Sequence, residues 1–211
     1  MSSSKTWVGP LMGVLFLLVA VVAIILVGEG QDATEKSAAE IVDFYDENED
    51  EQFVGSFLVG IATVLFVFFA GWLRMILRRA EGESGTLSAV SFGGALIFAI
   101  GAAIVATLNL ALADTADDID PVAVQAVNAI VWDYYIPFIV GVSVFLLAAG
   151  ISIVRHGALP TWLGWVAVVL GVIGATPLGF FALLAGALWI LVVSILGLMR
   201  SREDGATPRT P

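Results

Sequence analysis

The polar side chains inside the long apolar segments are the residues of this sequence that could carry chemistry. Asp133 and Asn109 stand out, because an ionisable or amide group at membrane depth is costly unless it has a partner or a function. Asn109 lies near the end of one apolar segment and Asp133 near the start of the next, so both are expected close to the same membrane surface. Such a cluster could hold a small polar solute. The candidate polar site consists of Asn109, Asp133, Tyr134 and Tyr135.

A structural interpretation of Asp133 is also open. The residue lies four positions into its segment, which is roughly 6 Å along a helix axis at about 1.5 Å per residue. At this interfacial depth, water and the positive end of the helix dipole both stabilise a carboxylate. The neighbouring Trp132, Tyr134 and Tyr135 are typical of the aromatic belt at a membrane surface. Asp133 can therefore be explained without any ligand.

The stretch 40–51 is a second cluster of candidate ligands, with seven carboxylates. Carboxylate oxygens suit calcium, but the spacing differs from that of an EF-hand loop and the turn glycine is missing. Acidic residues are also favourable at a helix N-terminus without any metal. We therefore expect these carboxylates to be solvated and predict no metal site.

A short amphipathic helix is expected just before and within this acidic stretch. Residues 37–40, Ser-Ala-Ala-Glu, match the capping box that marks a helix start. The following apolar side chains would give the helix one apolar face, which we expect to rest on the bilayer as an external lid. These side chains are Ile41, Val42, Phe44 and Tyr45.

Arg74, Arg78 and Arg79 form a basic edge at the end of an apolar segment. Cations at this depth can contact the headgroups of anionic lipids. The alternative is that they only anchor the segment, with the Arg74 side chain extending toward the surface.

Several kinds of chemistry are excluded by residue type. The sequence has no cysteine and a single histidine, His156, which removes disulfides, thiolate metal sites, cysteine nucleophiles and histidine-rich metal clusters. No paired carboxylates, nucleophile and base, or metal-ligand set occur at membrane depth. We therefore predict no enzyme, no cofactor and no nucleic-acid partner.

The elements that must position these residues are membrane-spanning helices. The chain has 211 residues, 59% of them hydrophobic, and a mean hydropathy of +0.99, which is more apolar surface than a soluble domain can bury. A span needs about 20 apolar residues, and the first segment is too long for a signal peptide. The sequence predicts an all-α, single-domain protein, 1–211, with spans at about 7–27, 53–77, 87–113, 129–154, 159–175 and 177–199, an external loop at 28–52 and a cytoplasmic tail at 200–211.

The fifth of these six spans is the shortest. The apolar region 159–199 is too long for one crossing, and Pro177 with its neighbouring glycines divides it near the middle. Two helices joined by a tight turn fit best. The fifth is about 17 residues, the lower limit for a span, so a re-entrant segment is the alternative.

The orientation follows from the cations, because short cytoplasmic loops retain lysine and arginine. Six spans with both ends inside place eight of the nine cations in or near the cytoplasm. The acidic loops 28–52 and 114–128 then lie outside. We predict a plasma-membrane protein with both termini cytoplasmic.

Small residues at four-residue spacing predict where helices pack closely, since association in lipid depends on packing. Such seams suit contacts within the chain, with a second copy or with another membrane protein. The predicted seams are Ala95, Ala99 and Ala103; Ala167, Gly171 and Ala175; and Ala182 with Gly186.

Three short motifs carry a resemblance to a known group. They are LPTWLGW at 159–165, LRMILRRAEG at 73–82 and Asp43-Phe44-Tyr45. Together they resemble uncharacterised multi-helix bacterial integral membrane proteins classed under domains of unknown function. The resemblance implies a membrane protein of bacterial origin and brings no catalytic residues.

Two functions follow as expectations. The leading one is a non-enzymatic accessory or interaction subunit, because polar residues in the spans are sparse and small-residue seams are plentiful. The alternative is a small transporter or channel with an outward-facing polar site near Asn109 and Asp133. A continuous row of polar side chains through the bundle would favour transport, whereas a half of the bundle without polar side chains would count against it.

Overall fold

The chain is described by a computed structural model that covers residues 7–28, 32, 33 and 35–206, with side chains as far as Arg202. Within this part of the chain the secondary structure is entirely helical, as predicted. The helices are α1 (Val8–Val27), α2 (Ala38–Glu47), α3 (Glu49–Glu81), α4 (Thr86–Thr115), α5 (Pro121–Asp133), α6 (Ile136–His156), α7 (Thr161–Gly174) and α8 (Gly179–Ala206).

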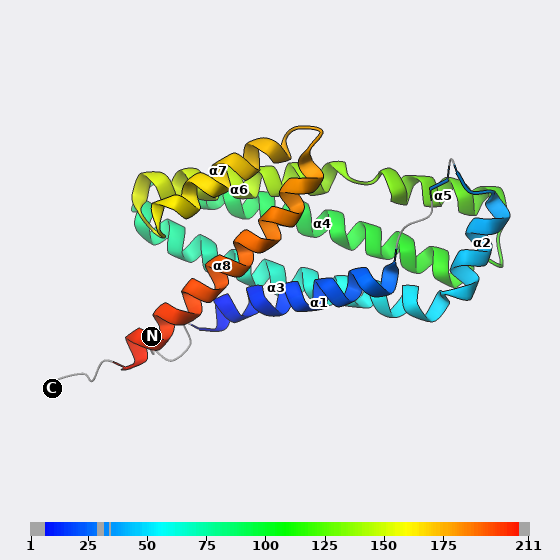
Figure 1. Cartoon of the computed structure of the whole chain (residues 1–211), viewed down its shortest axis with the longest axis horizontal. Helices are drawn as coiled ribbons and strands as arrows, with labels where there is room; N and C mark the ends of the chain where they lie inside the picture. The colour runs from blue at the N-terminus through cyan, green and yellow to red at the C-terminus, as the bar shows by residue number, and fades with distance from the viewer. Residues whose placement is uncertain (1–6, 29–31, 34, 207–211) are drawn as a thin grey trace.

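The long helices lie side by side along the long axis of the molecule (Figure 1). In order across the bundle, α1 packs on α3, α3 on α4, α4 on α6, and α6 on α7. Helix α8 crosses this layer obliquely and contacts both α7 and α1. Helices α2 and α5 lie together at one end of the molecule, and the start of α1 and the end of α8 lie toward the other. After the orientation predicted from the cations, we call these the outer end and the inner end.

Five apolar helical segments in the described residues are long enough to cross a membrane, which confirms the membrane class. They are Val8–Val27, Glu49–Glu81, Thr86–Thr115, Pro121–His156 and Gly179–Arg202. The predicted count of six is not reproduced, because α7 has 14 residues. A helix of this length spans roughly 21 Å, against about 30 Å of hydrocarbon.

The predicted span 129–154 falls within the apolar segment Pro121–His156, but its helix is interrupted between α5 and α6. Tyr134 leaves the helical conformation with φ −80° and ψ 55°. Pro137, in the first turn of α6, lacks the N–H that would continue the hydrogen-bond ladder from α5, so a new helix starts here. The predicted loop 114–128 is also partly helical: α5 begins at Pro121, after an N-cap in which the Asp120 side chain accepts from the Val122 amide at 2.8 Å.

The predicted helix after Ser37 is present, but its apolar face does not rest on lipid. The Ser37 and Glu40 capping box forms as expected. The side chains of Ile41 and Tyr45 are buried, 0% and 2% exposed, in a small core with Leu112, Ala116 and Val124. The bilayer prediction fails because α4 and α5 extend beyond the expected span ends and offer α2 a protein surface to cover.

Glycine contacts set the closest helix pairs. At Gly94 of α4, an added Cβ would overlap the backbone nitrogen of Phe145 in α6, and at Gly141 of α6 it would lie 2.5 Å from the backbone nitrogen of Phe98. The predicted seam residues are buried except for Ala103 and Ala175, which are exposed. The tight seam of α4 therefore includes Gly94, one position away from the predicted alanine stripe.

An aromatic layer fills the middle of the bundle. The Phe66 ring of α3 contacts one ring on each of three neighbouring helices, at centroid distances of 5.0 to 5.7 Å. Phe145 in turn lies 6.0 Å from the Trp189 ring of α8. The aromatic layer consists of Phe16, Phe66, Phe98, Phe145 and Trp189.

Candidate functional site

A cavity of about 170 Å³ lies between the aromatic layer and the α2–α5 cap. Residues of five helices converge on it because α2 and α5 fold back over the outer ends of α1, α3 and α4. Its lining mixes amides and a phenol with apolar groups and carries no formal charge. The lining residues are Val27, Phe44, Tyr45, Gln52, Asn109, Asn128, Val131 and Trp132.

Hydrogen bonds hold three of the polar lining residues in place. The Tyr45 hydroxyl donates to Oδ1 of Asn128 at 3.0 Å, which ties α2 to α5. Nε2 of Gln52 donates to the Val27 carbonyl at 2.7 Å. This second bond satisfies one of the carbonyls left open at the C-terminus of α1, as buried helix ends require.

Asn109 differs from these residues. Its side chain is 7% exposed and lines the cavity, yet it has no hydrogen bond to any residue that the structure describes. Its amide is not sealed off, because the fully buried side-chain atoms without a partner in the described residues are the hydroxyls of Ser56 and Ser194. Asn109 is therefore the residue of this cavity most available to a bound polar molecule.

The cap over the cavity is fastened by its own polar contacts. Nε2 of Gln125 on α5 donates to the carbonyls of Ala33 and Lys36, at 3.2 and 3.0 Å, just before α2. Hydrogen bonds from the backbone and hydroxyl of Ser37 lower the pKa of Glu40. The carboxylate is thus favoured where it closes the N-terminus of α2.

The buried phenol of Tyr45 predicts a pH-dependent cap. Burial raises the pKa of Tyr45 from 10.0 to about 12. Because the folded pKa is the higher one, this contribution to stability is complete below pH 10 and is lost as the pH rises through about 12. In a titration followed by tyrosinate absorbance, we expect a step at about pH 12 that Tyr45→Phe removes. Ionisation of Tyr45 near pH 10 would contradict the burial.

The predicted polar site is only partly assembled. Asn109 lines the cavity, whereas Asp133 and Tyr135 are exposed and lie outside its lining. Tyr134 is half-buried, and its ring packs edge-on against Phe138 at 6.3 Å. The cavity instead uses Tyr45, Gln52 and Asn128, which lie on segments outside the predicted core of the spans.

A second polar cluster lies at the inner ends of α3, α4 and α6. The carboxylate of Glu81, 9% exposed, accepts from the hydroxyls of Ser152 at 2.6 Å and Ser88 at 3.4 Å. Sequence reasoning missed this residue. The available signal was its spacing, since Leu73, Leu77 and Glu81 follow one another at four-residue intervals on the buried face of α3.

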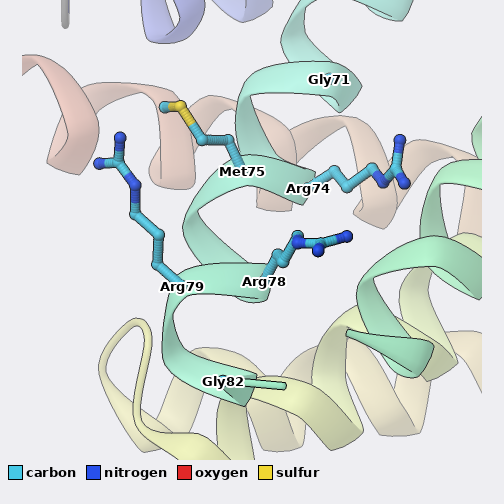
Figure 2. A pocket seen from close by; sticks show the side chains of 6 residues that line it. All are labelled: Gly71, Arg74, Met75, Arg78, Arg79 and Gly82. Carbon is cyan, nitrogen blue, oxygen red and sulfur yellow. The ribbon is translucent and has the colours of Figure 1, made fainter. Parts of the chain in front are cut away.

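The three predicted basic residues border a separate groove on the last turns of α3 (Figure 2). Arg74 and Arg78 extend to one side of the helix, and Arg79 extends to the other. The guanidinium of Arg74 lies 5.4 Å from the ring centre of Phe92 on α4. In contrast to the outer cavity, this groove is open and strongly positive.

The acidic residues do not assemble into a ligand set. Among the residues with described positions, no group of three or more His, Cys, Asp or Glu side chains is placed to hold a metal ion. The acids at 49–51 form the first turn of α3, where they complement its dipole.

Comparison with known proteins returns one family. The model of a domain of unknown function, DUF4386, matches residues 11–201. No curated protein and no solved structure matches the chain.

Proposed function

We propose that the chain, which belongs to the DUF4386 family, is a non-enzymatic multi-pass membrane protein that acts as an accessory or interaction subunit. The observation that supports this most is the aromatic layer. Its rings pack against one another across α1, α3, α4, α6 and α8 and separate the outer cavity from the Glu81 cluster. Rings that fill the middle of the bundle favour a role in assembly over the passage of a solute.

The apolar surface of α1 supplies a contact face for such a role. Its exposed side chains are entirely aliphatic along the outer half of the helix, and α1 packs mainly against α3 and α8. A helix held on one side can receive a second membrane helix on the other through van der Waals packing. The exposed side chains are Leu18, Val21, Val22, Ile24 and Ile25.

A crosslinking experiment tests this role. A photoreactive residue placed at Ile24 should capture a membrane protein, either a partner or a second copy, when the chain is purified from its native membrane. The same residue at Val169, exposed on α7, serves as the matched control. Equal capture at both positions, or capture of lipid alone at Ile24, would count against an interaction face on α1.

We further propose a bacterial plasma-membrane protein with six crossings and both termini cytoplasmic. The cations support this orientation, because Arg155 ends α6 and Nη1 of Arg200 on α8 donates to the Ala158 carbonyl between α6 and α7 at 3.3 Å. Both therefore share the inner end with the arginines of α3, as the positive-inside rule expects. The acids of α2 lie at the outer end.

The sixth crossing depends on the α7–α8 hairpin and can be tested separately. Because the sequence has no cysteine, a single Thr176→Cys in the α7–α8 turn can be labelled without background. A crossing hairpin predicts labelling by an impermeant thiol reagent from outside. Asp46→Cys on α2 is the outer control and Ser201→Cys the inner one. Protection of Thr176→Cys from both sides would favour the re-entrant alternative.

A small transporter or channel is the second candidate, favoured by the unpaired Asn109 in the outer cavity. The lining carries no formal charge, so a neutral or zwitterionic polar solute is the suitable class. Small molecules that stay with the purified protein can be identified by native mass spectrometry. Asn109→Leu should abolish their retention, whereas Asp133→Ala, outside the lining, should preserve it. Retention unchanged by Asn109→Leu would remove this candidate.

A further inference from the structure

The inner end of α3 carries a groove of about 560 Å³ whose polar groups are all cationic. We call it the basic groove, and Figure 2 shows the residues that line it on the last turns of the helix. It is open on one side and belongs to neither the outer cavity nor the Glu81 cluster. Its residues are Gly71, Arg74, Met75, Arg78, Arg79 and Gly82.

The three guanidinium groups form no ion pair with the side chains that the structure describes. Within the described chain no carboxylate lies within 4.0 Å of Arg74, Arg78 or Arg79. The nearest acid in sequence, Glu81, is buried and accepts hydrogen bonds from Ser152 and Ser88. The described side chains therefore leave these cations available to an external anion.

Helix chemistry accounts for only part of this arrangement. Arg78 and Arg79 lie in the last turn of α3, where cations are favoured by the helix dipole, but that effect fades beyond the last turn. Arg74 lies a further turn back, half-buried, with its charge above the Phe92 ring at 5.4 Å. Contact with an aromatic ring holds this guanidinium in place beside the groove.

An exposed apolar stripe on α3 leads into the groove. Neighbouring residues of the stripe are three or four positions apart. The one longer interval, from 68 to 75, contains Gly71 at the same spacing, so the stripe forms one continuous line on the helix surface. From Arg74 back to Val64 is ten residues, about 15 Å, which is half of the hydrocarbon core. The stripe consists of Phe57, Ile61, Val64, Phe68 and Met75.

We propose that the basic groove binds the phosphate of an anionic phospholipid, with its acyl chain along this stripe. A guanidinium forms paired, charge-assisted hydrogen bonds to phosphate oxygens. A soluble phosphate compound would use the same cations but would gain nothing from the apolar line beside them. The juxtaposition of the cationic groove with the exposed apolar stripe is what favours a lipid. This assignment requires only that the chain lies in a membrane, and it holds for either proposed function.

The test is lipid competition on the intact protein in nanodiscs. Native mass spectrometry should find phosphatidylglycerol retained in preference to phosphatidylcholine. The preference should fall about tenfold or more for each arginine of the groove changed to glutamine, since each change removes charge-assisted hydrogen bonds to the phosphate, which contribute roughly 1.5–3 kcal/mol. Arg155→Gln, which removes an inner-end cation outside the groove, is the matched control and should preserve the preference.

Three outcomes would overturn the assignment. One is equal retention of both lipids by the unmodified chain, and another is an equal loss in Arg155→Gln and Arg74→Gln. The third is displacement of phosphatidylglycerol by millimolar glycerol phosphate, which would point to a soluble phosphate. If a variant with all three arginines changed to glutamine fails to fold, Arg74→Gln and Arg74→Lys are compared instead: lysine should keep most of the preference and glutamine should not.

Discussion

Gly94→Val is expected to separate α4 from α6 and to leave most of the protein unfolded after mild heating. A side chain at Gly94 would overlap the backbone nitrogen of Phe145 and come within 2.9 Å of the Gly141 carbonyl oxygen. Backbone atoms cannot turn aside as a flexible side chain can, so the two helices must move apart. Overpacking typically costs about 1–3 kcal/mol, and a contact with fixed backbone lies at the upper end of this range. Size-exclusion chromatography after heating in detergent measures the fraction that stays folded.

The neighbouring Gly93 provides a matched control on the same helix. A Cβ built at Gly93 has no heavy atom within 4 Å, so Gly93→Val adds the same atoms without a clash. It should leave the melting profile within a few degrees of the unmodified chain, since valine is a slightly better helix former than glycine. Equal losses at the two positions would show that valine disturbs α4 itself and not its contact with α6.

The helical class and most of the long helices could be predicted because length and composition alone define them. The predicted span 7–27 agrees with α1, and 87–113 falls within α4, at residues 86–115. An apolar run long enough to cross hydrocarbon has few alternatives, since backbone groups in lipid must be satisfied within the helix. The predicted spans end at the first polar residues, however, whereas two of the helices continue beyond them. Helix α3 starts at Glu49 and α4 continues to Thr115, because outside the membrane a helix can continue through charged residues.

The candidate site was harder to predict, because it joins residues far apart in sequence. Tyr45 meets Asn128 across 83 positions, and Glu81 meets Ser152 across 71. Each partner taken singly is an ordinary polar residue near a helix end, where exposure to water is the usual outcome. Only the packing of α2 and α5 over the outer ends, and of α3 against α6 at the inner end, turns them into buried pairs. Asn109 was found because it interrupts an apolar run.

Phe66→Ala should destabilise the bundle more than truncation of any exposed aromatic on α3. The ring is 3% exposed and contacts Phe16, Phe98 and Phe145 on three other helices. Its removal leaves a cavity that no single helix can close, since movement toward one neighbour opens a gap at the others. Large aromatic truncations in a packed core cost about 3–5 kcal/mol. In a bilayer we expect a cost in the lower part of this range. Apolar side chains that leave the packed core enter lipid, which solvates them almost as well as the core does.

The same mutation separates the two proposed functions, with Phe68→Ala as its control. Phe68 lies two residues away on α3 and is 65% exposed, so its truncation should change the unfolding midpoint little. A closed accessory protein should lose stability with Phe66→Ala and remain impermeable in proteoliposomes. A transporter or channel whose aromatic layer acts as a gate should instead leak small solutes, because the opening would join the outer cavity to the hydroxyls of the Glu81 cluster. Leakage from Phe66→Ala but not from Phe68→Ala would therefore reverse the order of the two proposals.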